Sequence, residues 1–184
     1  MKRCLWPQSE NMIKYHDEEW GVPVHNDKIL FEFLILEGAQ AGLSWSIVLK
    51  KRENYRKALN NFNIKKISQY TDKDFQRLLN DEGIIRNKLK IKSTIENARA
   101  FLKIQKEFQT FDKYIWSFVN NKPIKNSFKT LKDIPPKTEI SDKISLDLKK
   151  RGFKFVGSTI IYAFMQAVGM TNDHQTDCFR YNKV

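Results

Sequence analysis

Two cysteines and two histidines stand near opposite ends of the chain. Cys4 and His16 lie close to the N-terminus, and His174 and Cys178 lie close to the C-terminus. Residues four apart share one face of a helix, so His174 and Cys178 could reach one metal ion, and the four residues together would form a closed Cys2His2 set of the kind that holds structural zinc. The two pairs are far apart and neither is a Cys-x-x-Cys motif. The spacing alone therefore fits, at least as well, two free buried cysteines with hydrogen-bonded histidines.

A carboxylate stands at the end of an apolar helical pattern. Glu37 is followed by Gly38, Gly42, Leu43 and Trp45. Glycines let a loop approach a ligand or another backbone closely, and an apolar side chain between two helices can act as a wedge in a base stack. The segment indicates either such a ligand-facing loop or an ordinary corner between two helices.

A short glycine-containing junction connects two further helical patterns near residues 80–88. Gly83 and Ile84 occupy the junction, and the second pattern begins with the cations Arg86, Lys88, Lys90 and Lys92. Free amides at a helix N-terminus, together with cations, form an anion site, for which DNA phosphate is an obvious ligand. Because any hairpin of two helices has this pattern, the junction alone is weak evidence.

The composition is that of one globular domain with a strong positive charge. The 184 residues include 33 Lys and Arg against 21 Asp and Glu, a formal net charge of +12, and 41% of the residues are hydrophobic. This excess makes a polyanion the first partner to consider, although a solvated basic surface also fits. Two cysteines are too few for a secreted disulfide scaffold, and no stretch suits a signal peptide or a membrane span. We therefore expect a cytoplasmic protein that does not bind a membrane.

Helical spacing dominates the chain, and no strand-like alternation persists, which predicts an all-α fold. A first helix is expected to be capped by Asp27 and to end near Gly38, and a second to run from about Ser44 to Phe62. A capping box at Thr71 and Asp74 opens a short helix. A longer helix follows, with one face formed by Ile91, Ile95, Ala98 and Leu102.

The sequence of the C-terminal half predicts three more helices and one long connection. The first covers Phe111–Val119, and the second is capped by Ser141, with Ile144 and Leu148 turned inward. The segment Gly157–Val168 is apolar nearly all round, so we expect it to be the central buried helix. The lysine-rich segment Pro123–Pro136 is expected to be an exposed connection.

Taken together, these residues resemble the bacterial 3-methyladenine DNA glycosylase I family, within the helix-hairpin-helix glycosylases. The resemblance extends over nearly the whole chain. Its motifs are Arg3-Cys4 with Trp6, Tyr15-His16-Asp17, Glu19-Trp20-Gly21, Leu36-Glu37-Gly38, Gln40-Ala41-Gly42-Leu43-Ser44-Trp45, Gly83-Ile84-Ile85-Arg86, Trp116-Ser117-Phe118-Val119, the run Lys149–Gly157, and Asn172-Asp173-His174 with Cys178. Met12 departs from the family, which often has an aromatic residue at that position.

The resemblance implies one glycosylase domain over residues 1–184. Its helix-hairpin-helix lobe would cover roughly residues 40–120, and the N- and C-terminal segments would form a second lobe around one structural zinc ion. The resemblance makes Cys4, His16, His174 and Cys178 the zinc ligands. Glu37 becomes the catalytic residue that contacts the excised base, in a pocket lined by Tyr15, Trp45, Trp6 and Trp20. On the DNA side, Gly42 and Leu43 would fill the gap left by the flipped nucleotide, and the phosphate hairpin would comprise Gly83, Ile84, Arg86 and Lys88.

The activity that the resemblance implies is base-excision repair of double-stranded DNA that contains alkylated adenine. The enzyme would flip the nucleotide, hydrolyse the N-glycosidic bond and release 3-methyladenine, without lyase activity and as a monomer. Two alternatives remain. A glycosylase for oxidised or mismatched bases would normally require a catalytic Asp or Lys after the hairpin, and an iron–sulfur cluster would need more than two cysteines. A non-catalytic, zinc-stabilised DNA-binding module would have no use for Glu37 among four aromatic residues.

Overall fold

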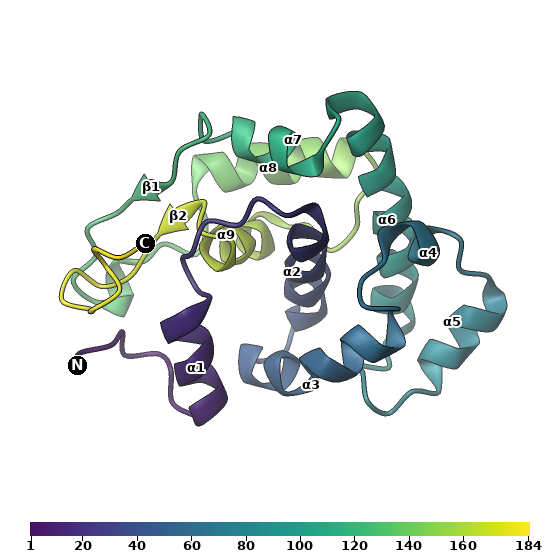
Figure 1. Cartoon of the computed structure of the whole chain (residues 1–184), viewed down its shortest axis with the longest axis horizontal. Coiled ribbons are helices and arrows are strands. Elements are labelled where there is room, and N and C mark those ends of the chain that lie inside the picture. Colours follow the sequence, from purple (N-terminus) through teal and green to yellow (C-terminus); the bar gives the residue numbers. More distant parts are fainter.

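The computed structural model describes all 184 residues and is built almost entirely of helices (Figure 1). The helices are α1 (Glu10–Glu18), α2 (Asp27–Gln40), α3 (Trp45–Ala58), α4 (Ile64–Ser68), α5 (Asp72–Leu79), α6 (Lys88–Phe108), α7 (Phe111–Ser117), α8 (Glu139–Lys150) and α9 (Ser158–Ala167). A 3-10 turn, η1, covers Leu131–Asp133. No helix has both the length and the apolar character needed to cross a membrane.

Helix α2 is the centre of the core. Every residue from Leu30 to Ala39 is buried, and α9 and α3 both pack against this helix. The expectation that Gly157–Val168 would be the central helix is therefore only partly right, because Thr159 of α9 is exposed and α9 lies beside α2. Glu32 and Glu37 interrupt the apolar pattern of α2, which made its full burial hard to detect.

Several predicted helix boundaries require correction. Asn26, not Asp27, caps α2, and its side chain accepts from the amides of Lys28 and Ile29. Asp27 instead accepts from the amides of Phe111 and Asp112 at the start of α7. The capping box at Thr71 and Asp74 is confirmed. For α8 the cap is Thr138, and Ser141 is its buried capping-box partner.

Two predicted helices differ from the structure in more than their caps. The helix expected to reach Phe62 ends at Ala58, because Asn60, Asn61 and Phe62 adopt positive φ angles that turn the chain into α4. On α6, Ile91, Ile95 and Ala98 are buried as predicted. Leu102 is only half-buried, and the buried positions belong instead to its neighbours Phe101 and Ile104.

The fold also contains one short strand pair that an all-α domain would lack. β1 (Ile124–Lys125) pairs in parallel with β2 (Thr171–Asn172). This pair joins the long connection after α7 to the C-terminal segment. The connection over residues 123–136 was expected to be exposed, and none of its residues is buried, while backbone hydrogen bonds to Met170 and Asn172 fix its β1 segment in place.

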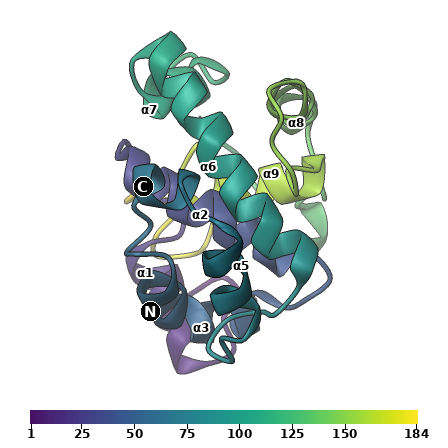
Figure 2. The same cartoon turned by 90° about the vertical axis from the view of Figure 1, so that its right-hand side faces the viewer.

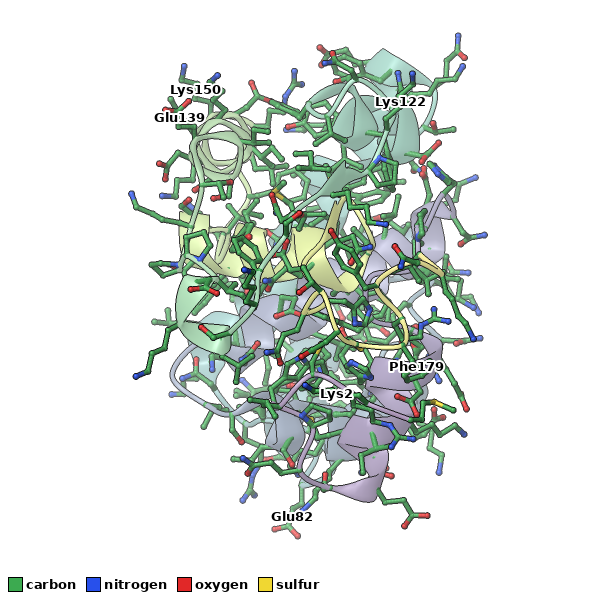
Figure 3. All side chains as sticks on the ribbon, turned by 90° about the vertical axis from the view of Figure 1, so that its left-hand side faces the viewer. Lys2, Glu82, Lys122, Glu139, Lys150 and Phe179 are labelled. Atoms are coloured by element: carbon green, nitrogen blue, oxygen red, sulfur yellow. The ribbon has the colours of Figure 1, made fainter.

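The two chain ends lie together on one side of the molecule (Figures 1 and 3). The amide of Phe179 donates to the carbonyl of Lys2 at 2.9 Å, and the Lys2 ammonium pairs with Asp177. On the opposite side the long helix α6 crosses the domain, with α5 beside its first half (Figure 2). One continuous hydrophobic core connects these two sides.

Candidate active site and metal-binding cluster

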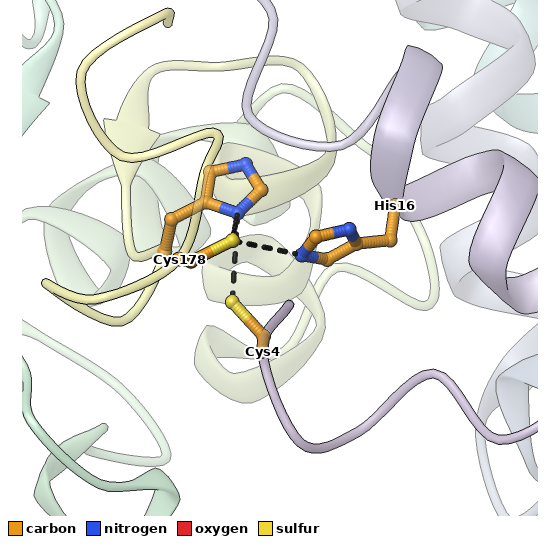
Figure 4. Close-up of side chains that lie close together, drawn as sticks. Cys4, His16 and Cys178 are labelled. Atoms are coloured by element: carbon orange, nitrogen blue, oxygen red, sulfur yellow. Dashed lines mark hydrogen bonds between the residues drawn. The ribbon is translucent and has the colours of Figure 1, made fainter. Parts of the chain in front are cut away.

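The four predicted metal ligands form a buried cluster where the chain ends meet (Figure 4). The ligand atoms of Cys4, His16, His174 and Cys178 all lie within 4.8 Å of one another. The Cys178 Sγ is 3.5 Å from His16 Nε2 and 3.6 Å from His174 Nδ1, and the Cys4 Sγ is 3.5 Å from the same His174 nitrogen. The spatial prediction is confirmed, and the group could hold a metal ion.

The element that presents His174 and Cys178 is not the helix that the spacing suggested. These residues lie in an irregular turn after β2, in which the amide of Cys178 donates to the carbonyl of Gln175. The amide of Gln175 donates to the Cys4 Sγ at 3.3 Å, so the turn also fixes the N-terminal ligand. A turn brings residues i and i+4 to one point as effectively as a helix does.

Each imidazole has its outer nitrogen bound to a protein oxygen. The Nδ1 of His16 is 2.8 Å from Asp17, whose carboxylate also accepts from the Arg3 guanidinium at 2.9 Å. The Nε2 of His174 is 3.0 Å from the carbonyl of Trp20. Such outer contacts orient histidines whose other nitrogen faces a metal. Both remaining nitrogens here face the cluster.

Burial disfavours the charged forms of the Cys4 thiol and of both imidazoles. It raises the pKa of the Cys4 thiol to about 12 and lowers the pKa of His174 to about 4. The Cys4 thiol is therefore protonated and His174 neutral at pH 7 unless a cation is present, because desolvation disfavours the charged forms. A divalent cation would reverse this preference at the sulfur atoms, since thiolates are its ligands.

A cavity of about 310 Å³ lies next to this cluster, between α1, α2 and α9. Its lining residues are Trp6, Met12, Tyr15, Trp20, Glu37, Gln40, Trp45, Leu131, Ile134, Ala163 and Gln166. The five residues that the resemblance placed in the pocket (Glu37, Tyr15, Trp6, Trp20 and Trp45) all line this one cavity, together with Met12.

Glu37 is the chemically unusual residue of the cavity. Its side chain is only 4% exposed, yet none of the side-chain hydrogen bonds or ion pairs in the protein involves it. Burial raises the pKa of Glu37 to about 8. The carboxyl is therefore largely protonated at pH 7 and would ionise readily beside a cation.

The other two buried carboxylates have partners. Glu32, five residues earlier on α2, accepts from Arg52 at 2.6 Å and from Arg56 at 2.7 Å. Asp173 accepts from four side chains, among them Tyr162 at 2.5 Å and Gln166 at 2.8 Å. Glu32 and Asp173 therefore stabilise the fold, whereas Glu37 is left facing the cavity.

Aromatic rings form most of the cavity wall. Trp6 lies edge-on to Trp20 with ring centroids 5.1 Å apart, and Tyr15 lies 5.3 Å from Trp45. The indole N–H groups of Trp6 and Trp45 are buried without an acceptor in the protein. Unpaired buried donors are costly, and folded proteins contain few of them.

Sequence reasoning missed the residues that close the cavity on the side of the long connection. Leu131 and Ile134 lie in the segment expected to be exposed; Leu131 is exposed and Ile134 is half-buried, and both line the cavity. The signal available in the sequence was two apolar residues within a lysine-rich run. Gln40, Ala163 and Gln166 were also not predicted, and they carry no distinctive signal because helices α2 and α9 place them only through packing.

The turn between α2 and α3 stands beside the cavity. Gly42 has a φ of +76°, a conformation that glycine adopts without strain, and Leu43 follows with 39% of its surface exposed. The neighbouring Gln40 and Trp45 both line the cavity. The turn therefore presents an apolar side chain to solvent at the cavity edge.

The hairpin before α6 is confirmed as a tight turn, but its free groups differ from those expected. The amides of Gly83 and Ile84 already donate to Asp81, and the Ile84 side chain is buried. The hydrogen bonds within the protein leave the amides of Arg86, Lys88 and Leu89 unused. An anion at this helix start would meet these three amides, together with the exposed side chains of Arg86 and Lys88.

Comparisons with known proteins agree with this geometry. Residues 6–181 match the family described as Methyladenine glycosylase. The chain is 50% identical over 182 residues to DNA-3-methyladenine glycosylase 1 of Escherichia coli (strain K12), with 98% of this chain and 97% of that protein covered.

Two solved structures show the same fold. A crystal structure of 3-methyladenine DNA glycosylase I matches with a TM-score of 0.94 at 49% identity and covers 97% of this chain and 98% of its own. A tyrosine-to-phenylalanine variant of a 3-methyladenine DNA glycosylase I, solved in complex with 3-methyladenine, matches with a TM-score of 0.94 at 34% identity over 97% of both chains. The enzyme class expected from the sequence, a DNA-3-methyladenine glycosylase, is confirmed, and the chain belongs to the methyladenine glycosylase family.

Proposed function

We propose that this chain hydrolyses the N-glycosidic bond of 3-methyladenine in alkylated double-stranded DNA and acts as a monofunctional enzyme in base-excision repair. The observation that carries the proposal is the buried, unpaired Glu37 carboxyl in an aromatic cavity. The names of the similar proteins support the same substrate.

The cavity suits a base that carries positive charge. Methylation at N3 makes adenine cationic within DNA and weakens its glycosidic bond. Aromatic faces attract a cation by roughly 0.5–2 kcal/mol each, and the cavity offers Trp6, Trp20, Tyr15 and Trp45. A cationic base would lower the pKa of Glu37, and the ionised carboxylate would then accept from the exocyclic amine.

Recognition of the cationic base does not by itself account for the rate. An enzyme accelerates a reaction only through interactions that strengthen in the transition state, and the departing base loses its charge. The acceleration must therefore come from positioning of the water, strain on the bond or stabilisation of the sugar cation. Of two roles, recognition of the base and activation of the water, we assign Glu37 to recognition of the base.

The lining of the cavity argues against a lyase step. A lyase needs a lysine or another amine that attacks the sugar carbon and forms a Schiff base. No lysine lines this cavity. The expected product is therefore an abasic site in an unbroken strand.

The DNA would reach the cavity through two surface features. Unstacking and flipping a nucleotide costs a few kcal/mol, and Leu43 at the cavity edge would fill the space that the nucleotide leaves. The hairpin of Gly83 and Ile84 would bind a backbone phosphate through the free amides at the start of α6, with Arg86 and Lys88 beside them. These residues belong to the part of the domain, roughly 40–120, that we assign to the helix-hairpin-helix lobe.

We assign one structural zinc ion to Cys4, His16, His174 and Cys178. Two thiols and two imidazoles form a donor set that zinc prefers, and four protein ligands leave no open position for catalysis. The ion would join the N-terminal segment and α1 to the C-terminal turn. It would thereby stabilise Trp6 and Tyr15 on the cavity wall, without taking part in the reaction.

Release of the free base tests the proposal. DNA treated with a methylating agent is incubated with the protein, the released bases are separated by chromatography, and the strands are analysed for breaks. Release of 3-methyladenine from intact strands supports the proposal. A protein that binds the DNA but releases no base would be a binding module, and cleaved strands would show a lyase.

A further inference from the structure

Lys90 lies on the first turn of α6, but its side chain does not face solvent as its basic neighbours do. Its ammonium donates to the carbonyl of Ala39 at 2.8 Å and to the carbonyl of Ala41 at 2.6 Å. Burial lowers the pKa of Lys90 below its ordinary value. Although the sequence placed Lys90 among the phosphate-binding cations, this geometry turns it toward the protein.

The two acceptors of Lys90 lie at a sensitive point of the fold. The last carbonyls of a helix have no partner within the helix, and Ala39 and Ala41 stand at the end of α2. Glu37 precedes Ala39 by two residues and Ala41 by four, and Leu43 follows Ala41 by two residues. A cation at a helix C-terminus is favourable and also holds that terminus in one position.

A second contact from α6 supports the same end of α2. The side-chain amide of Asn97 is 3% exposed and makes reciprocal hydrogen bonds with the backbone of Lys154, at 2.8 and 2.9 Å. Phe155, the next residue, has a φ of +55° and packs so closely on Gly38 that an added Cβ there would lie 3.2 Å from the Phe155 Cβ. Helix α6 therefore contacts the end of α2 directly through Lys90, and indirectly through Asn97 and the Lys154–Phe155 segment.

We propose that Lys90 is a positioning residue, which holds the end of α2 against α6 so that Leu43 and Glu37 have a fixed place relative to the phosphate-binding start of α6. Helix α6 begins with the free amides and Lys88, two residues from Lys90, so one rigid element joins the DNA-binding hairpin to the cavity. The inference rests on the proposed excision of 3-methyladenine and adds to it a residue that contacts neither base nor phosphate.

The test compares single-turnover excision with DNA binding in Lys90→Met, which keeps the aliphatic chain and removes the two donors. Excision is measured with saturating enzyme on methylated duplex DNA, and binding to undamaged duplex is measured as a function of salt. We expect the excision rate to fall about tenfold to a hundredfold, as for a small displacement of reacting groups. The salt dependence should stay that of the unmodified protein, because no phosphate contact is lost.

Three further variants make the result specific. Lys88→Met should reduce the salt slope by about one, as the loss of a phosphate contact does. Lys103→Met, an exposed lysine at the far end of α6, should change neither excision nor binding. Lys90→Arg keeps a donor for the carbonyls and should recover part of the excision rate.

Each other outcome overturns the inference. A salt slope reduced by about one in Lys90→Met, with unchanged excision at saturation, would make Lys90 a phosphate contact. Unchanged excision together with an unchanged slope would give it no role. Excision losses that follow the loss of thermal stability in both Lys90 variants would mean general destabilisation. If the unmodified protein itself released no 3-methyladenine, the proposed function would fail instead.

Discussion

Replacement of Glu37 by glutamine should stabilise the protein while it impairs excision. Burial raises the pKa of Glu37 from 4.5 to about 8 in the folded protein. Since one pKa unit corresponds to about 1.4 kcal/mol, ionising this carboxyl costs about 5 kcal/mol of folding stability once the pH is well above 8. Glutamine has nearly the same shape and no charge to desolvate.

The sign of the effect gives it a distinctive pH dependence. The folded state holds the Glu37 proton more tightly than the unfolded state, so the penalty is absent below pH 4.5 and grows as the pH rises toward 8. We expect the stability of Glu37→Gln, relative to the unmodified protein, to be near zero at pH 4.5, about 3 kcal/mol higher at pH 7, and larger still at pH 9. Urea unfolding at these three pH values measures the difference.

Glu32→Gln is the matched control, because Glu32 is the other buried glutamate on α2. Its carboxylate is paired with Arg52 and Arg56, and loss of one partner of a buried ion pair costs about 3–5 kcal/mol. Glu32→Gln should therefore destabilise the protein. A stability difference for Glu37→Gln that stays constant from pH 4.5 to pH 9 would refute the reasoning.

The Glu37→Gln variant also tests the role of Glu37 in the reaction. Glutamine cannot become a carboxylate beside a cationic base, so excision of 3-methyladenine should fall while folding improves. In the unmodified protein, kcat/KM should rise with pH as the Glu37 proton becomes easier to remove, and Glu37→Gln should lack this rise. Unchanged excision by the variant would remove Glu37 from the mechanism.

The remaining predictions concern the metal cluster, the exposed turn and the hairpin. Protein purified without added metal should contain about one zinc ion per chain by elemental analysis, and Cys4→Ser should lower both the zinc content and the melting temperature. Leu43→Ala should leave thermal unfolding nearly unchanged because Leu43 is partly exposed. It should slow single-turnover excision about tenfold, because a smaller side chain fills less of the space that the flipped nucleotide leaves and so offsets less of the free energy of unstacking. Gly83→Ala should weaken DNA binding measured by fluorescence anisotropy, since a Cβ there would lie 3.0 Å from the Asn54 Cβ and would force the hairpin to shift.

Much of the local structure was accessible from the sequence. The apolar spacing on α6 and α8 and the capping box at Thr71 depend on residues within one or two turns of each other, and these predictions are confirmed apart from Leu102. The boundaries that differ depend on neighbours far along the chain. Asp27, for example, is used by α7 and not by its own helix.

The sequence also supplied the residue types of the candidate site, but not its arrangement. Cys4 and His174 are 170 positions apart, and spacing alone could not decide between a metal cluster and two separate buried pairs. The contact of Phe179 with Lys2 brings the two ends together, and the parallel pairing of β1 and β2 holds the C-terminal segment against the connection after α7. Such long-range pairings leave no periodic pattern in the residues that form them.

Glu32 and Glu37 show most clearly which properties the sequence determines and which ones the tertiary structure determines. Both are buried glutamates on α2, and although glycines follow Glu37, nothing in the local sequence says which of the two carboxyls has a cationic partner. Packing places two arginines of α3 beside Glu32 and only the cavity beside Glu37. The sequence by itself determined that carboxylates would be present on an apolar helix. The tertiary structure decided which carboxylate is neutralised by cations and which one is left to meet a ligand. The reason is that the pKa of a buried carboxyl depends on the charges that other elements bring to it.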